Sequence, residues 1–168
     1  MIKPRVAVLF GSDSDWSVME KCVAQLREFG ESPHVEAVSA HRSPDRVAAW
    51  AKEAEAAGFE VIIAAAGMSN ALAGAVAAHT ILPVIGVPLS SGSLLGFDAL
   101  LSTVQMPPGI PVAAMSVGEA GAKNAALLAI QIIARKDAKL AEAYRAFKTK
   151  QAEQVAAKNK ALQERIGS

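Results

Sequence analysis

The chain has 168 residues, of which 52% are hydrophobic, 20% charged and 5% aromatic, and its formal net charge is +1. Such a length suits a single domain with its own hydrophobic core, and the balanced charge argues against a protein that binds nucleic acid. The single cysteine, Cys22, excludes an internal disulfide and a multi-cysteine metal site, and we expect a cytoplasmic protein because the N-terminal apolar run is too short for a signal peptide.

The first part of the chain alternates predicted strands and helices. Residues 5–10 form a short apolar run that is typical of a buried strand, and the helical pattern that follows ends at Gly30, which suits a C-cap. Residues 34–39 predict a second strand. The next helix is expected over residues 44–57, with Ser43 as its N-cap and a proline at its first position.

The alternation continues to the C-terminus. In chain order we expect a strand at 61–66, a short helix at 71–80, a strand at 82–88, a helix at 94–104, a strand at 111–117, an alanine-rich helix at 120–134 and a long charged helix at 137–166. Repeated strand–helix units predict an α/β fold with a five-stranded parallel sheet covered on both faces. We expect one catalytic domain at residues 1–136, with residues 137–168 packing on this body or on a neighbouring subunit.

The chain carries no Asp, Glu, Lys or Arg from Val61 to Phe97. A run of about 20 apolar residues can cross a bilayer. This stretch is interrupted by glycines, prolines, serines, an asparagine and a histidine, which argues against a membrane span. We expect it to be buried in protein on several sides.

Four polar or glycine-rich segments follow the first four predicted strands. They are GSDSD at 11–15, SAHRSP at 39–44, GMSN at 67–70 and SSGS at 90–93. Ligands of open parallel sheets bind beyond the carboxyl ends of the strands. The topology therefore predicts that the four loops converge on one ligand.

The first loop offers backbone N–H groups and hydroxyls at the start of a helix, which attract polar or anionic ligands. Its carboxylates, Asp13 and Asp15, would repel a phosphate but accept hydrogen bonds from ribose hydroxyls. We therefore expect this loop to hold a sugar, with simple helix capping as the alternative. The sequences of a P-loop and of a GxGxxG loop are both absent here.

The second loop places a titratable group beside a fixed cation. His41 can exchange a proton near neutral pH, and Arg42 can bind a phosphate with two parallel hydrogen bonds. Ser39 adds a hydroxyl. The alternative for His41 is a purely structural hydrogen bond.

The third loop offers neutral groups. Gly67 permits a close backbone approach, and Ser69 and Asn70 supply donors and acceptors, although Asn70 could instead cap the next helix. His34 and His79 lie outside these loops and are expected to be structural. Cys22 falls on a helical apolar stripe and is expected in the core, and no residue spacing predicts a metal site.

Five longer segments occur along the chain in a fixed order: GSDSDW at 11–16, SAHRSPDR at 39–46, LPVIGVP at 82–88, LLSTVQMPPGIPVA at 100–113 and AKNAALLAIQI at 122–132. Together they resemble the PurE family of de novo purine biosynthesis over nearly the whole chain. Class I members are N5-carboxyaminoimidazole ribonucleotide mutases. Class II members are aminoimidazole ribonucleotide carboxylases that use CO2 directly, and both classes form 4-carboxy-5-aminoimidazole ribonucleotide.

The resemblance implies a flavodoxin-like three-layer αβα sandwich and a homo-octamer with active sites at subunit contacts. It implies a small ribonucleotide as substrate and CO2 as an intermediate or a substrate. It implies no metal and no organic cofactor. The balanced charge and the interrupted apolar stretch lead us to expect neither nucleic acid nor a membrane as a partner.

The resemblance also implies roles for single residues. The 5′-phosphate would be bound by Ser39 and Arg42, and His41 would be the general acid–base. The ribose and the neighbouring phosphate region would be bound by Ser12, Ser14 and Asp15. The complete set of expected substrate-binding residues is Gly11, Ser12, Ser14, Asp15, Ser39, Ala40, Arg42, Gly67, Ser69, Asn70 and Leu72.

The third loop departs from the class I pattern. Class I members resemble GGAAHLPG there, with a second active-site histidine, whereas this chain has GMSNALAG at 67–74. Without gaps, Ala71 replaces the histidine and Ala73 the proline. The Ser-Asn pair resembles class II, in which an arginine usually precedes it, and here that residue is Met68.

Most class-marking segments resemble class I, so we expect the carboxyl group to move from N5 to C4, with direct carboxylation by CO2 as the alternative. A non-catalytic nucleotide or flavin binder, and an enzyme for another ribonucleotide, are further alternatives because doubly wound sheets host many functions.

Overall fold

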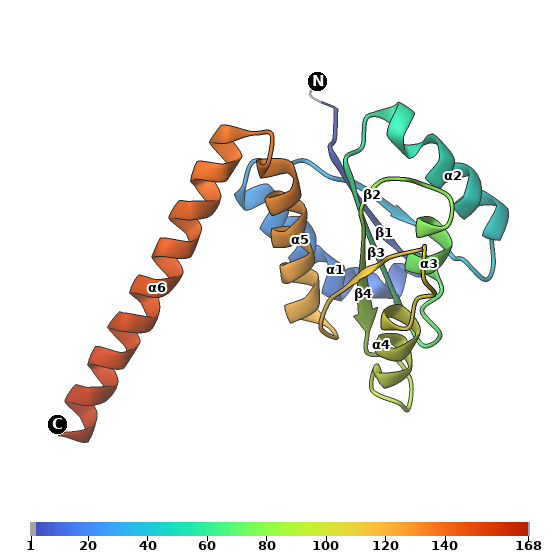
Figure 1. Ribbon diagram of the computed structural model, residues 1–168. Helices are drawn as coiled ribbons and strands as arrows, with labels where there is room; N and C mark the ends of the chain where they lie inside the picture. Colours follow the sequence, from blue (N-terminus) through green and yellow to red (C-terminus); the bar gives the residue numbers. More distant parts are fainter. Residues whose placement is uncertain (1–2, 168) are drawn as a thin grey trace.

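The computed structural model describes residues 3–167 and has the expected three layers, with helices on both faces of a parallel sheet (Figure 1). The sheet order is β2-β1-β3-β4-β5, and every neighbouring pair is parallel. The strands are β1 (Val6–Phe10), β2 (His34–Ala37), β3 (Val61–Gly67), β4 (Val84–Leu89) and β5 (Ala113–Ala114). The helices are the short 3-10 helix η1 (Asp13–Asp15), α1 (Trp16–Glu28), α2 (Pro44–Ala57), α3 (Leu72–Ala77), α4 (Phe97–Val104), α5 (Glu119–Ala134) and α6 (Ala138–Ile166).

Both faces of the central strands are buried, which explains why their sequences are apolar throughout rather than alternating. Along β1, Val6, Val8 and Phe10 face a core cluster shared with α1 and α5. Ala7 and Leu9 face the opposite cluster, which α2 and α3 complete. The α/β fold with a five-stranded parallel sheet is thus confirmed.

The predicted caps are only partly correct. Pro44 is the first residue of α2, and Gly58 ends this helix in the left-handed conformation, with φ of 99°. Gly30 follows α1 with φ of 80°. Ser43 is the N-cap residue of α2, as predicted, but its hydroxyl donates to the Ser39 carbonyl oxygen (3.0 Å) and makes no capping hydrogen bond with the helix.

The fifth strand and the fourth helix are shorter than predicted. Two residues form β5, although the Met115 and Gly118 amides still donate to the carbonyl oxygens of Gly86 and Pro88 on β4. Pro88 has no N–H to donate in return, which limits regular pairing. The helix expected from residue 94 begins at Phe97, because Leu95 has a left-handed backbone, with φ of 52°.

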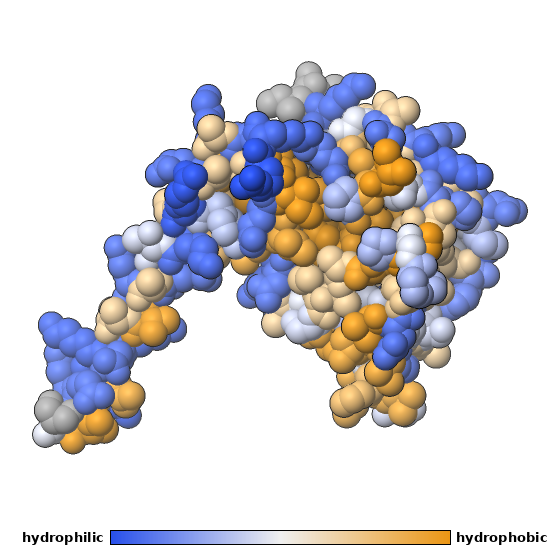
Figure 2. Space-filling model, in the orientation of Figure 1, coloured by the Kyte–Doolittle hydropathy of each residue, from blue (hydrophilic) through white to orange (hydrophobic). Residues whose placement is uncertain are grey.

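The uncharged stretch from Val61 to Phe97 forms β3, α3, β4 and the loop before α4. Within residues 3–167, no helix is both long and apolar enough to cross a membrane. The strands are buried, but large apolar side chains on and just before α4 are exposed, namely Leu94, Leu95, Phe97, Leu101 and Val104. Figure 2 shows hydrophobic surface over this end of the molecule. Coverage of this surface by other subunits stays a prediction.

The C-terminal helix packs on the body only at its start. Leu140 is buried in the core, and the rings of Tyr144 and Phe147 lie 6.0 and 5.4 Å from that of Phe29. Beyond these residues the helix extends away from the body (Figure 1). Val155, Leu162 and Ile166 of its apolar stripe are exposed.

One glycine in α5 permits an unusually close backbone contact. A Cβ atom on Gly121 would lie 1.7 Å from the carbonyl oxygen of Ser116, a backbone atom that cannot rotate away. We expect Gly121→Ala to lower the free energy of unfolding by about 3 kcal/mol, the upper part of the usual range for overpacking. Urea denaturation followed by circular dichroism measures this change.

Gly74→Ala in α3 is the matched control for this prediction. Its Cβ would meet only the flexible end of Met106, at 3.3 Å. We expect that variant to unfold close to the wild-type midpoint. Equal stability of the two variants would contradict the backbone clash.

Candidate functional site

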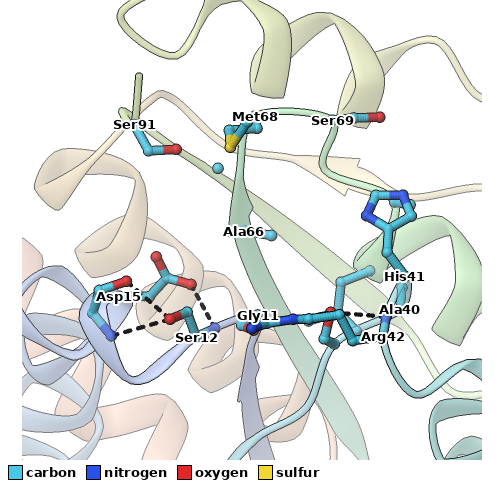
Figure 3. Close-up of a pocket in the computed structure, with 15 residues that line it drawn as sticks. Gly11, Ser12, Asp15, Ala40, His41, Arg42, Ala66, Met68, Ser69 and Ser91 are labelled. Carbon is cyan, nitrogen blue, oxygen red and sulfur yellow. Dashed lines mark hydrogen bonds between the residues drawn. The ribbon is translucent and has the colours of Figure 1, made fainter.

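The four loops beyond the carboxyl ends of β1 to β4 converge as predicted. They surround a cavity of about 520 Å³ (Figure 3). The first and second loops contribute Gly11, Ser12, Ser14, Asp15, Ser39, Ala40, His41 and Arg42. The third strand with its loop and the fourth loop contribute Ala66, Gly67, Met68, Ser69, Ala71, Leu72 and Ser91.

The first loop is held by a capping box around η1. The Ser12 amide donates to Asp15 Oδ2 (3.0 Å), and the Ser12 hydroxyl oxygen accepts from the Ser14 amide (3.4 Å). Burial raises the pKa of Asp15, and the amides of Ser12 and Gly11 oppose that shift. These residues cap the turn and also line the cavity, so capping does not exclude that they bind a ligand.

The second loop carries a guanidinium that is tied to the first loop. Arg42 donates from Nη2 to the Gly11 carbonyl oxygen (2.9 Å) and from Nε to Ser39 Oγ (3.3 Å). These two bonds leave other N–H groups of the exposed guanidinium free to bind an anion. The arginine therefore joins the two loops and can still bind a phosphate.

His41 stands beside this arginine. Figure 3 shows its ring raised from Ala40 and Arg42 on the side of Ser69. In the part of the chain that the structure describes, the exposed ring makes no hydrogen bond. The structural alternative for His41 therefore has no support, and the ring is open to a ligand in the cavity.

The third loop divides its residues between the cavity and the interior. Ser69 lines the cavity, but Asn70 does not, and only 1% of Asn70 is exposed. Its Nδ2 donates to Thr103 Oγ1 (2.9 Å) and to the Val87 carbonyl oxygen (3.4 Å). The expectation that Asn70 binds substrate is thus wrong for this structure, because its amide is used between β4 and α4. The capping alternative is wrong too, since Ala71 is the N-cap residue of α3.

Gly67 permits a close approach between two loops of the cavity. A Cβ atom on this residue would lie 1.8 Å from Ser91 Oγ, so the fourth loop contacts the third directly. Ser91 is one of four lining residues that were not in the expected substrate-binding set, together with Ala66, Met68 and Ala71. The position of SSGS after β4 was the signal for Ser91, but nothing in that loop distinguished one serine from the others.

The remaining titratable candidates lie elsewhere. His34, at the amino end of β2, has its ring 6.0 Å from Trp50 and 5.7 Å from Phe59, and His79 lies beyond α3 in a separate hollow. Cys22 is buried in the core, as predicted, and burial raises its pKa to about 12. Among residues 3–167, no three His, Cys, Asp or Glu side chains gather in a way that could hold a metal ion.

Comparison with known proteins gives one consistent result. The model of the AIR carboxylase family matches residues 5–154. An N5-carboxyaminoimidazole ribonucleotide mutase of Mycobacterium tuberculosis (strain H37Rv) is 49% identical over 165 residues, which cover 98% of this chain and 94% of the relative. The enzyme of the same name from Escherichia coli K12 is 48% identical over 152 residues, 90% of this chain and 89% of the relative. The crystal structure of Treponema denticola PurE has a TM-score of 0.86 at 33% identity and covers 95% of this chain and 99% of that one.

Proposed function

The chain belongs to the AIR carboxylase family, and from this premise we propose that it converts N5-carboxyaminoimidazole ribonucleotide into 4-carboxy-5-aminoimidazole ribonucleotide in purine biosynthesis. The observation that carries the proposal is the convergence of four loops on one cavity, where His41 stands beside Arg42. A mutase needs a polar nucleotide site and one group that can both give and take a proton. This cavity offers both.

The first two loops are suited to the ribose 5-phosphate part of the substrate. Arg42, held against Gly11 and Ser39, presents a fixed cation to the phosphate, and arginine is well shaped for phosphate oxygens. The carboxylate of Asp15 and the hydroxyls of Ser12 and Ser14 would accept from and donate to the ribose hydroxyls. Because the guanidinium is already positioned, little ordering is needed when the nucleotide binds.

His41 would move one proton in each half of the reaction. In the first half, the bond between N5 and the carboxyl carbon breaks, its electron pair stays on N5, and protonated His41 gives N5 a proton, which leaves CO2 and aminoimidazole ribonucleotide. In the second half, C4 attacks CO2 and neutral His41 takes the C4 proton. The histidine returns to its starting state, and such proton transfer contributes typically about 10²–10⁴-fold in rate.

Retention of CO2 between the two halves would depend on the opposite wall of the cavity. Ala66, Ala71 and Leu72 line that wall with apolar groups, and Met68 lies beside them. Exclusion of water from such a pocket prevents side reactions of a trapped intermediate. Retention of both fragments in contact supplies part of the rate advantage.

The proposed assembly is a homo-octamer in which other copies cover the exposed apolar residues around α4. A surface that exposes Leu95, Phe97 and Leu101 together is unusual for a chain that works alone. We also propose that α6 packs against a neighbouring copy beyond Phe147, where its apolar stripe is exposed. A cytoplasmic location is also proposed, because a chain with one buried cysteine and no disulfide is compatible with a reducing compartment.

Incubation with each nucleotide in CO2-free buffer tests the reaction. We expect the protein to form 4-carboxy-5-aminoimidazole ribonucleotide from the N5 carbamate, faster than an enzyme-free sample, and not from aminoimidazole ribonucleotide alone. Chromatography with ultraviolet detection separates the nucleotides. A colourless purified protein would also exclude the alternative of a tightly bound flavin.

Direct carboxylation of aminoimidazole ribonucleotide by CO2 is the second candidate function. It is favoured by Ala71, which stands where class I members have a histidine. If aminoimidazole ribonucleotide is carboxylated only when CO2 is added, and the N5 carbamate is not converted, the protein is a direct carboxylase and the mutase proposal is wrong. Conversion of neither nucleotide would exclude both reactions.

A further inference from the structure

A buried polar contact joins the third pocket loop to α4. Asn70 follows directly after Ser69 of the pocket lining, and Thr103 lies in the last turn of α4. Each residue is only 1% exposed, and the Asn70 amide nitrogen lies 2.9 Å from Thr103 Oγ1. The proposed reaction uses neither of these residues.

The hydrogen-bonding capacity of the two groups fixes the direction of the contact. The Thr103 hydroxyl has one hydrogen, which it donates to the carbonyl oxygen of Ala99 (2.6 Å). Thr103 can therefore only accept from Asn70, so the Nδ2 group of the amide must face α4. The Asn70 Oδ1 atom is buried, with no hydrogen-bond partner among the described residues. Buried polar groups are normally paired, so the unpaired Oδ1 atom makes this position of the Asn70 side chain energetically unfavourable.

The backbone next to Asn70 is strained. Met68 has φ of 53°, a left-handed conformation that a residue with a side chain adopts only when its surroundings enforce it. The loop closes tightly through two backbone hydrogen bonds. The backbone N–H of Asn70 donates to the Met68 carbonyl oxygen (3.0 Å), and the backbone N–H of Ala71 donates to the Ser69 carbonyl oxygen (2.7 Å). A strained turn of this kind needs an anchor, and Asn70 is the only residue of the turn that is buried.

We propose that Asn70 and Thr103 are positioning residues that hold the Met68–Ser69 turn in the shape that closes the wall of the cavity opposite the ribose and phosphate loops. The contact acts on the bond-making half of the reaction rather than on nucleotide binding, because Arg42 and Asp15 belong to other loops. The inference rests on the proposed function for its kinetic consequence. The anchoring itself can be measured without turnover.

Two substitutions of Thr103 separate the hydrogen bond from packing. Thr103→Val keeps the branched shape and removes the acceptor for Asn70. Thr103→Ser keeps the acceptor and removes the methyl group, which packs so closely on β4 that a Cβ on Gly86 would lie 2.4 Å from it. A positioning role predicts that the valine variant loses function, whereas a packing role predicts that the serine variant does.

The first measurement is amide hydrogen exchange in the intact protein, read from the fragment that covers residues 68–72. We expect exchange to rise about tenfold in Thr103→Val, as loss of one buried hydrogen bond would allow, and to stay near wild type in Thr103→Ser. The second is steady-state formation of 4-carboxy-5-aminoimidazole ribonucleotide by whichever route the wild type uses. We expect kcat to fall about tenfold in the valine variant, with an unchanged nucleotide KM, and to be retained in the serine variant.

Unchanged exchange in the valine variant, or a kcat that falls equally in both variants in step with their thermal stability, would overturn the positioning role. If the wild type forms no product from either nucleotide, the proposed function fails, and the exchange experiment still decides whether Asn70 and Thr103 anchor the turn.

Discussion

His41→Asn is expected to abolish measurable turnover, because loss of the proton-transfer group should lower kcat by about 10²–10⁴-fold. Asparagine keeps a polar side chain at the position but cannot exchange a proton near neutral pH. The ring lines the cavity and makes no hydrogen bond within residues 3–167, so its removal should leave the loop in place. Stopped assays over a long time course measure kcat, and calorimetric titration with 4-carboxy-5-aminoimidazole ribonucleotide measures binding, which we expect to change little.

His79→Asn provides the matched control for this experiment. It makes the same chemical change at an exposed histidine that lies outside the cavity, in a hollow with Lys52 and Glu55. We expect wild-type kcat in that variant. Near-normal kcat in His41→Asn would remove this histidine from the acid–base role, and loss of nucleotide binding together with turnover would assign it to binding instead.

The features that sequence could predict are those that depend on local chemistry. Continuous apolar runs such as residues 61–66 predicted a strand buried on both faces, and β3 is such a strand. Alternation of strands and helices then placed the carboxyl ends of the parallel strands at one edge. Convergence of the loops that carry Ser12, His41 and Ser69 followed from topology alone.

The features that sequence could not predict depend on contacts between distant residues. Asn70 looked like a ligand or a cap because it follows Ser69 in the loop after a strand. Its side-chain amide instead donates to Thr103, far along the chain, in the interior. The length of β5 depends on the missing N–H of Pro88 in the adjacent strand. The left-handed backbone at Leu95, which delays the start of α4, has no signal in a leucine.

A comparison of two arginines can distinguish direct binding of the phosphate by Arg42 from a general attraction by positive charge near the cavity. Arg42 lines the cavity and is tied to Gly11 and Ser39, whereas Arg46, four residues later, is exposed and pairs with Glu36 outside the cavity. Replacement of either arginine by methionine removes one positive charge and keeps a long side chain. A general field effect would therefore weaken substrate binding similarly in both variants.

We expect Arg42→Met to raise the KM for the nucleotide about 100-fold, the effect of losing roughly two charge-assisted hydrogen bonds to a phosphate. Arg46→Met should leave KM close to the wild-type value. Arg42→Lys should lie between them, because a lysine keeps the charge but cannot form two parallel bonds or hold Gly11 and Ser39 together. Initial rates over a range of nucleotide concentrations measure KM, and inhibition by ribose 5-phosphate, a probe without the imidazole ring, should weaken in parallel in Arg42→Met. An equal rise of KM in Arg42→Met and Arg46→Met, or unchanged inhibition by ribose 5-phosphate, would show that the phosphate is bound elsewhere.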